Sequence, residues 1–214
     1  MASETDKISR EFDEDACDFC ERYQKRGLSR SSKSLLTLIL AEGITGKSAA
    51  DLGCGAGGFC IELLKNGASD AVGFDLSPKM IESANGLASA KGIDSRAKFQ
   101  VGNAAEMEVP SVDLVVMDKV LCCYYEWQPL LKNTISASRD MIGLVVPRDT
   151  GVAKWPFRLG VRLVNYFQRR GGKLLFYLHP LDQVDRTLRE SGFNLLKKQS
   201  SRFWLVFLYS RNKR

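Results

Sequence analysis

Residues 51–58 read Asp-Leu-Gly-Cys-Gly-Ala-Gly-Gly, and they lie between a short apolar run and a segment with helical spacing of apolar residues. Gly53, Gly55 and Gly58 satisfy the pattern G-x-G-x-x-G, in which glycines allow a tight turn at a helix N-terminus and let a ligand approach the backbone. Asp75 follows Gly55 by 20 residues, at the end of a second apolar run. A carboxylate at this place reaches ribose hydroxyls, so the stretch predicts a bound nucleotide in a β-α-β unit.

Short apolar runs and helical patterns alternate along the rest of the chain. Strands are expected at residues 48–52, 71–74, 97–101, 112–117, 141–146, 174–178, 193–198 and 203–209. Helices are expected before residue 46 and at residues 57–65, 78–91, 129–139, 155–170 and 181–190. The last two strands are separated by a short polar segment, which favours an antiparallel pair. Continuous apolar strands separated by helices are typical of a parallel sheet covered on both faces.

Composition limits the class of protein. The chain has 214 residues, 44% hydrophobic and 26% charged, which suits one folded domain and excludes a disordered or collagen-like chain. No secretory signal opens the sequence and no apolar run is long enough to span a membrane, so we expect a cytoplasmic protein with reduced thiols. Cys17 and Cys20 form only half of a zinc ribbon and the single histidine, His179, is remote, so no metal site is predicted.

The net charge of +6 is unevenly distributed. Residues 1–22 carry eight acids and three bases, whereas residues 154–173 carry six bases and no acid. Such a basic segment attracts anions, and the aromatic and apolar residues within it would also suit an anionic lipid surface. A solvated helix face explains the same pattern, so both interpretations stay open.

The position of Asp51 distinguishes between cofactors. A dinucleotide lays its pyrophosphate over the glycine turn, where the carboxylate of Asp51 would meet two negative charges. S-adenosylmethionine instead carries an α-ammonium group and a sulfonium, and it has no phosphate. The sequence therefore favours S-adenosylmethionine over NAD.

The successive motifs, in order and spacing over about residues 30–150, resemble those of class I S-adenosylmethionine-dependent methyltransferases. They are Asp51-x-Gly53-x-Gly55-x-Gly57, Asp75-x-Ser77-x-x-Met80, Gly102-Asn103-Ala104 and the strand that ends at Asp118. The resemblance implies the α/β fold of this family: a Rossmann-like three-layer αβα sandwich with a mostly parallel seven-stranded sheet and an antiparallel final strand. It also implies a cofactor site made of Asp51, Gly53, Cys54, Gly55, Asp75, Leu76, Ser77, Met80, Asn103, Ala104 and Asp118.

A less specific similarity covers the C-terminal part. Residues 177–180, the Ser191-Gly192-Phe193 stretch and the last strand resemble the same parts of magnesium-protoporphyrin O-methyltransferases and of poorly characterised relatives. We accordingly expect residues 46–214 to form a class I methyltransferase domain, with residues 151–178 as a basic amphipathic insertion. Residues 1–45 are expected to form a helical segment that covers the site.

The acceptor is expected above the C-terminal ends of the fourth and fifth strands. Candidate catalytic residues are His179, Tyr124 and Lys119, because His179 has a suitable pKa for a general base and Lys119 would border the transferred methyl group. Candidate substrate-binding residues are Tyr23, Arg26, Cys122, Tyr125 and Arg148.

The predicted function is transfer of a methyl group from S-adenosylmethionine to a small-molecule thiol, hydroxyl or carboxylate by in-line displacement. The sequence lacks the Asn-Pro-Pro-Tyr or Asp-Pro-Pro-Tyr motif of base-amino methyltransferases and a Pro-Cys nucleophile after the fourth strand, so DNA is not an expected partner. RNA and a membrane surface are less favoured partners, and no oligomeric state is predicted. The alternatives are an RNA or protein methyltransferase, a cofactor-binding protein without transfer, and an NAD-dependent oxidoreductase.

Overall fold

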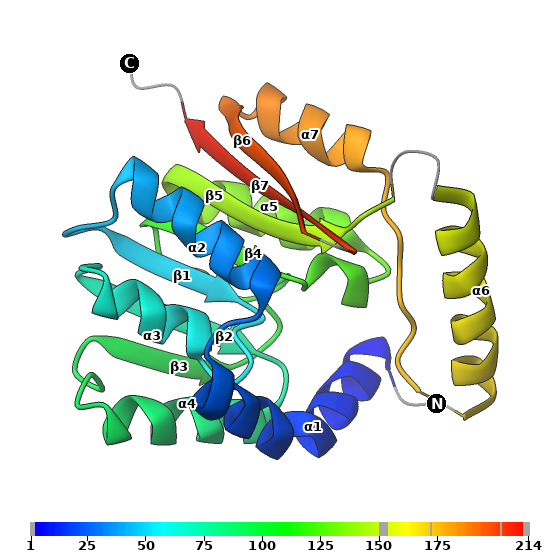
Figure 1. Cartoon of the computed structure of the whole chain (residues 1–214), viewed down its shortest axis with the longest axis horizontal. Helices are drawn as coiled ribbons and strands as arrows, with labels where there is room; N and C mark the ends of the chain where they lie inside the picture. The colour runs from blue at the N-terminus through cyan, green and yellow to red at the C-terminus, as the bar shows by residue number, and fades with distance from the viewer. Residues whose placement is uncertain (1–2, 150–153, 172, 202, 212–214) are drawn as a thin grey trace.

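A computed structural model describes residues 3–149, 154–171, 173–201 and 203–211. In this part of the chain one seven-stranded sheet has the order β3-β2-β1-β4-β5-β7-β6 (Figure 1). The strands are β1 (Ser48–Leu52), β2 (Asp70–Asp75), β3 (Ala97–Val101), β4 (Val112–Asp118), β5 (Ser138–Pro147), β6 (Phe193–Ser201) and β7 (Trp204–Arg211). β7 pairs antiparallel with both β5 and β6, while the other pairs are parallel. The predicted fold class and the antiparallel closing strands are confirmed.

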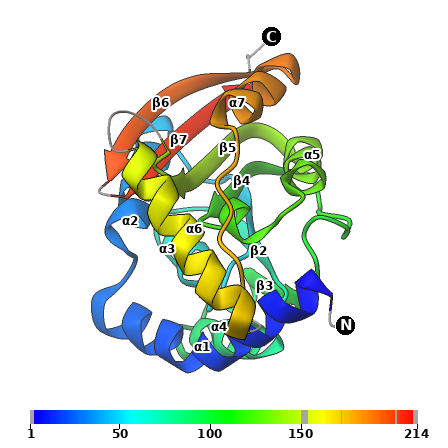
Figure 2. The same ribbon diagram turned by 90° about the vertical axis from the view of Figure 1, so that its right-hand side faces the viewer.

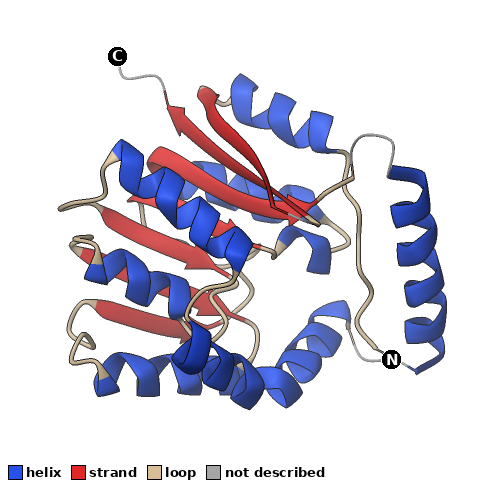
Figure 3. Ribbon diagram, in the orientation of Figure 1, coloured by secondary structure: helices blue, strands red, loops and turns tan. Residues whose placement is uncertain are grey.

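Helices cover both faces of the sheet (Figure 3). They are α1 (Glu4–Arg26), α2 (Arg30–Glu42), α3 (Gly58–Lys65), α4 (Pro78–Ala90), α5 (Trp127–Ala137), α6 (Lys154–Gly171) and α7 (Leu181–Glu190), with a short 3-10 turn, η1, at Leu121–Cys123. α2, α3 and α4 share one hydrophobic core with the sheet, and α5 and α7 share the other. Ala49 belongs to the first core and Ala50 to the second, because successive side chains of a strand point to opposite faces.

The strand order reverses between β1 and β4. β1 pairs with β2 on one side and with β4 on the other, so the chain crosses the sheet at this point. In open α/β sheets, ligands bind in the crevice outside the carboxyl ends of the strands at such a reversal. The glycine turn follows β1, Asp75 ends β2 and Asp118 ends β4. The predicted motifs therefore meet at the carboxyl ends of these strands.

Helix α1 runs across this edge of the sheet (Figures 1 and 2). Asp13 of α1 accepts hydrogen bonds from Ser77 Oγ at 2.5 Å and from the backbone N–H of Lys79 at 3.1 Å. Ser9 Oγ donates to the carbonyl oxygen of Leu76 at 2.9 Å. These bonds fix α1 over the N-terminus of α4, where a carboxylate is also favoured by the helix dipole.

The strand predicted at residues 174–178 is wrong. Residues 173–180 form an extended connection that runs beside α6 (Figure 2). Its backbone donors find partners outside the sheet: the N–H of Phe176 donates to Asn165 Oδ1 at 2.9 Å, and that of Tyr177 donates to the carbonyl oxygen of Cys122 at 2.8 Å. The apolar pattern therefore reflects packing between α6 and the sheet edge.

Among the described residues, no helix combines the length and the apolar character that crossing a bilayer requires.

Candidate active site

The glycine turn has a left-handed backbone. Gly53 and Gly55 have φ angles of 77° and 52°, a region that side chains other than glycine rarely adopt. A Cβ atom on Gly53 would also lie 2.5 Å from the side chain of Val120. The N–H of Gly55 donates to Asp75 Oδ2 at 2.8 Å, so the turn and the end of β2 are held together directly.

Asp51 is a buried carboxylate that lacks a full set of partners. Its side chain is 2% exposed, and Oδ1 has no hydrogen-bond partner among the described residues. Burial, followed by the nearby charges of Asp118 and Asp75, raises its pKa well above the ordinary value, while Lys119 acts in the opposite direction. A buried carboxylate in this state needs a cation. An α-ammonium group of S-adenosylmethionine fits this requirement, whereas a pyrophosphate does not.

Asp75 presents its two oxygens to the same space. Oδ2 accepts from Gly55 N–H, and Oδ1 accepts from the backbone N–H of Ser77 at 3.0 Å. Each carboxylate oxygen can accept a second hydrogen bond, so both retain capacity for ribose hydroxyls. Burial raises the pKa of Asp75, and the backbone N–H groups of Ser77, Gly55 and Leu76 oppose that shift.

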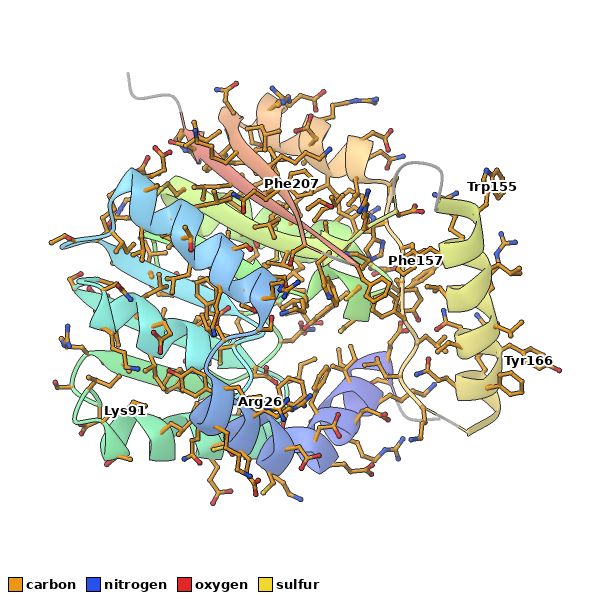
Figure 4. All side chains as sticks on the ribbon, viewed as in Figure 1. Arg26, Lys91, Trp155, Phe157, Tyr166 and Phe207 are labelled. Carbon is orange, nitrogen blue, oxygen red and sulfur yellow. The ribbon has the colours of Figure 1, made fainter. Side chains whose placement is uncertain are left out.

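A cavity of about 640 Å³ lies over these residues. Most of the predicted site residues line it: Tyr23, Arg26, Asp51, Gly53, Cys54, Gly55, Asp75, Leu76, Met80, Ala104, Asp118, Lys119, Cys122 and Tyr124. The structure thus brings together residues from both sides of the strand reversal and from α1. Arg26 lies at the end of α1, beneath the carboxyl edge of the sheet (Figure 4).

Four predicted residues that carry polar groups lie outside this lining: Ser77, Asn103, Tyr125 and Arg148. Ser77 caps α4 by accepting from the N–H of Met80 at 3.0 Å, and Asn103 Oδ1 accepts from Tyr124 Oη at 3.2 Å. Both therefore contact residues that line the cavity. Tyr125 is 66% exposed and Arg148 is also exposed, and their role in binding the substrate stays a prediction.

His179 is also outside the cavity lining. Its Nε2 lies 2.8 Å from the carbonyl oxygen of Leu121, so this nitrogen carries the proton and donates it. The ring lies 6.0 Å from that of Trp127 and 6.2 Å from that of Tyr177 between centroids. Burial lowers its pKa, which favours a neutral ring that holds the η1 turn. The predicted role of general base therefore has no geometric support.

We expect His179→Ala to leave the affinity for the cofactor unchanged and to lower stability by about 1–2 kcal/mol, because one buried hydrogen bond and ring packing are lost. For a chain of this size that corresponds to a fall in Tm of about 2–8 °C. Calorimetric titration and thermal unfolding measure the two effects. A loss of turnover without a loss of stability would return His179 to the reaction.

Lys119 lies at the centre of a polar cluster that the sequence did not predict. Its φ of 67° is a left-handed conformation in a residue with a side chain, at the point where β4 ends. Its Nζ lies 2.8 Å from Asp118 Oδ1, 2.9 Å from Ser32 Oγ and 3.1 Å from Ser29 Oγ. Ser32 also donates to Asp118 at 2.5 Å. The N-terminus of α2 therefore supplies hydroxyl groups to the site; no motif in the sequence marks them.

Apolar side chains from distant segments line the other end of the cavity. They are Leu174 and Phe176 of the 173–180 connection and Trp204 of β7. Phe12 and Phe19 of α1 also line the cavity. The rings of Phe176 and Trp204 are 6.5 Å apart between centroids and meet edge to face. The cavity thus has a polar end near β1 and β2 and an aromatic end near β7.

Two groups beside the cavity remain protonated. Burial is the main cause that raises the pKa of Tyr124, whereas the hydrogen bond with Cys123, followed by burial, raises the pKa of Cys122. Cys122 is therefore a thiol and not a thiolate nucleophile near neutral pH. Within the described ranges, no cluster of three or more His, Cys, Asp or Glu side chains could hold a metal ion.

Comparison with known proteins agrees with this geometry. Residues 45–150 match a family model described as a methyltransferase domain. Ajmaline N-methyltransferase from Rauvolfia serpentina is 40% identical over 68 residues, which are 31% of this chain and 23% of that protein. Ribosomal protein L11 methyltransferase from Escherichia coli is 31% identical over 101 residues, 47% of this chain and 34% of that protein. The matches thus span well under half the length of these curated relatives.

A solved structure is similar over nearly the whole chain. Magnesium protoporphyrin IX methyltransferase from Synechocystis PCC 6803 with bound SAH has a TM-score of 0.72 at 19% identity, and the similarity covers 96% of this chain and 98% of that one. At this identity the similarity is one of fold.

The fold is that of the Rossmann-like methyltransferases, and the polar end of the cavity carries their motifs. The chain belongs to the class I S-adenosylmethionine-dependent methyltransferases. The predicted resemblance is confirmed, including its extension to the magnesium protoporphyrin branch at the level of the fold. S-adenosylmethionine is the cofactor of this family.

Proposed function

We propose that the protein transfers the methyl group of S-adenosylmethionine to a small-molecule thiol, hydroxyl or carboxylate acceptor with an apolar body. The observation that carries this proposal is the single cavity with two unlike ends. The orphaned oxygen of Asp51 and the free acceptor capacity of Asp75 suit the cofactor. The aromatic end suits an acceptor that binds mainly through apolar contact.

The proposed roles follow from position. The bound cofactor supplies an activated methyl group on a sulfonium. Asp51 binds its ammonium group, Asp75 binds the ribose, and α1 excludes water from the reacting atoms. Lys119, supported by Ser29 and Ser32, orients an anionic or polar acceptor group at the junction of the two ends.

The acceptor needs little help from a base. His179 is not among the residues that line the cavity, its Nε2 is bonded to the carbonyl oxygen of Leu121, and Tyr124 and Cys122 are protonated groups with raised pKa values. A thiolate or a carboxylate acceptor already carries the electron pair that attacks the methyl carbon. Among the proposed acceptors, a carboxylate or a thiolate is therefore favoured over a hydroxyl, because it reaches the site as an anion, and the Lys119 ammonium group is a suitable partner for that charge.

A protein or RNA acceptor is the second candidate. One of the curated relatives is named for methylation of ribosomal protein L11, and the basic segment 154–173 would attract RNA. The small molecule is favoured because apolar side chains from α1, from the 173–180 connection and from β7 line the cavity on several sides. RNA binding would show a steep dependence on salt concentration.

The test is calorimetric titration with S-adenosylmethionine, S-adenosylhomocysteine and NAD, followed by transfer of labelled methyl groups to a panel of thiols, carboxylates and phenols. We expect micromolar binding of the two adenosyl ligands, no binding of NAD, and turnover of an apolar anionic acceptor. Binding of NAD alone would contradict the assignment of Asp51. Turnover of RNA or protein alone would select the second candidate.

Phe176→Ala separates the two ends of the cavity. This residue touches the aromatic end and is remote from the glycine turn, so its loss leaves cofactor affinity within about twofold and lowers kcat/KM for the acceptor about tenfold or more. Equal losses in both quantities would mean that the variant disturbs the fold of the whole site.

A further inference from the structure

Helix α6 exposes a large apolar face. The side chain of Trp155 is 77% exposed, that of Leu159 62%, that of Leu163 58% and that of Phe167 62%. Their spacing of four residues places them along one side of the helix. Trp155 and Tyr166 point away from the body of the molecule, whereas Phe157 points toward it (Figure 4). These outward residues make up the outer face of α6.

The outer face is not needed to hold α6 in place. Phe157, Val161 and Val164 on the opposite side line a second cavity of about 500 Å³ between the helix and the sheet edge. Arg158 binds Asp149 through two nitrogens, at 2.9 and 2.6 Å, and Asn165 donates to the carbonyl oxygen of Phe176 at 2.7 Å. The inner side therefore docks the helix on its own, and the outer face remains exposed to solvent.

The charge around the outer face is of one sign. Residues 154–173 contain six bases and no acid. Arg162 and Arg169 are exposed, and their positions along the helix place them on the flank of the apolar face. The outer face carries Trp, Tyr, Phe and Leu side chains and is flanked by arginines, which is the composition of a helix that lies in the plane of a membrane interface.

We propose that the outer face of α6 docks on the surface of a bilayer that contains anionic phospholipid, with the helix axis in the plane of the membrane. The apolar side chains enter the boundary between headgroups and acyl chains, and the flanking arginines meet the phosphates. This peripheral contact is independent of the methyl-transfer reaction.

Two other occupants fit the face less well. A second copy of the chain would bring the arginine flanks of two α6 helices together, and the segment has no acid to offset that repulsion. RNA would pair with the arginines but would leave the leucines and the tryptophan in water, because the outer face offers few polar groups for readout. A charged and partly apolar bilayer surface satisfies both parts of the pattern.

The test is co-sedimentation of the full chain with phosphatidylcholine vesicles, with and without phosphatidylglycerol. We expect binding to the anionic vesicles, at least a tenfold weaker affinity for neutral ones, and a blue shift of tryptophan fluorescence on binding. Trp155 is the most exposed of the three tryptophans, so Trp155→Phe removes that shift. Raising salt from about 0.1 M to about 1 M shortens the Debye length from about 10 Å to about 3 Å and weakens the binding.

Variants locate the contact. Leu159→Ser combined with Leu163→Ser lowers vesicle affinity about tenfold or more, and Arg162→Gln lowers it for anionic vesicles alone. Leu196→Ser is the matched control, because Leu196 is a 41% exposed leucine that lies on β6 and not on α6. It leaves vesicle binding unchanged. Thermal unfolding and cofactor titration establish that each variant is folded.

Three outcomes overturn the proposal. The first is the absence of vesicle binding by the wild-type chain at low salt. The second is vesicle binding that the double leucine variant does not reduce. The third is a result that assigns the face to another partner. It would be either a dimer in sedimentation velocity that the leucine variant abolishes or binding of a single-stranded RNA oligonucleotide in place of vesicles.

Discussion

Asp51→Asn weakens the binding of S-adenosylhomocysteine about 10- to 100-fold. The carboxylate is buried and its Oδ1 has no partner among the described residues. The ligand supplies an ammonium group that would donate a hydrogen bond to this oxygen. A hydrogen bond to a charged group contributes about 1.5–3 kcal/mol, and each 1.4 kcal/mol is a tenfold change in affinity. Calorimetric titration measures the loss directly.

Stability distinguishes this loss from damage to the fold. In the free protein the carboxylate of Asp51 is repelled by Asp118 and Asp75, and burial raises its pKa. The amide removes that repulsion at nearly constant shape, so the Tm of the Asp51→Asn variant is equal to or above that of the wild type. A residue that binds a ligand at the expense of stability behaves in this way. A lower Tm together with weaker binding would show that Asp51 is needed for the fold instead.

Binding is also linked to protons. The ordinary pKa of the carboxyl group is 3.8, and the folded protein holds Asp51 well above it. The folded state binds the proton more tightly than the unfolded state, so this group's contribution to stability is lost as pH rises from about 3.8 through the raised value. An ammonium group favours the carboxylate, so ligand binding releases protons in this range and affinity falls as the pH is lowered.

Titration in two buffers with different ionisation enthalpies measures the released protons. 5′-Methylthioadenosine is the matched control ligand, because it keeps the adenosine part and lacks the amino acid. It should release fewer protons than S-adenosylhomocysteine does, and so should S-adenosylhomocysteine with the Asp51→Asn variant, because the pairing of Asp51 with the ammonium group is absent in both. Proton uptake on binding to the wild type would rule out the pairing of Asp51 with the ammonium group.

The cofactor half of the site could be predicted because its residues are close in sequence. The turn at residues 51–58 and Asp75 belong to one β-α-β unit, whose geometry is fixed by local chain connections. A strand reversal beside this unit then determines where the ligand lies. The alternation of strands and helices likewise predicted a parallel sheet covered on both faces, whereas the order of its strands came from the structure.

The acceptor half could not be predicted in this way. Ser32, Phe176 and Trp204 come from three separate elements, and only tertiary packing brings them to one cavity. The 174–178 segment shows the limit of periodicity most clearly. Its apolar residues have the pattern of a strand, yet the side chain of Asn165 accepts the hydrogen bond that a neighbouring strand would have accepted.

Asp75→Ala weakens cofactor binding about tenfold or more, because the ribose hydroxyls lose a charged acceptor. The same carboxylate accepts from the N–H groups of Gly55 and Ser77, so its removal could also loosen the glycine turn. The affinity of one ligand alone does not separate these two effects. Asp70→Ala, at the exposed start of the same strand, is the matched control and leaves binding unchanged.

A coupling measurement separates them. In the wild type, adenosine binds more tightly than 2′,3′-dideoxyadenosine, because only adenosine offers hydroxyls to the carboxylate. If Asp75 binds the ribose, the two ligands bind the Asp75→Ala variant with nearly equal affinity, since the interacting pair is already broken. If the variant only loosens the turn, both ligands weaken in proportion and their difference persists. Wild-type affinity for S-adenosylhomocysteine in Asp75→Ala would remove Asp75 from the site altogether.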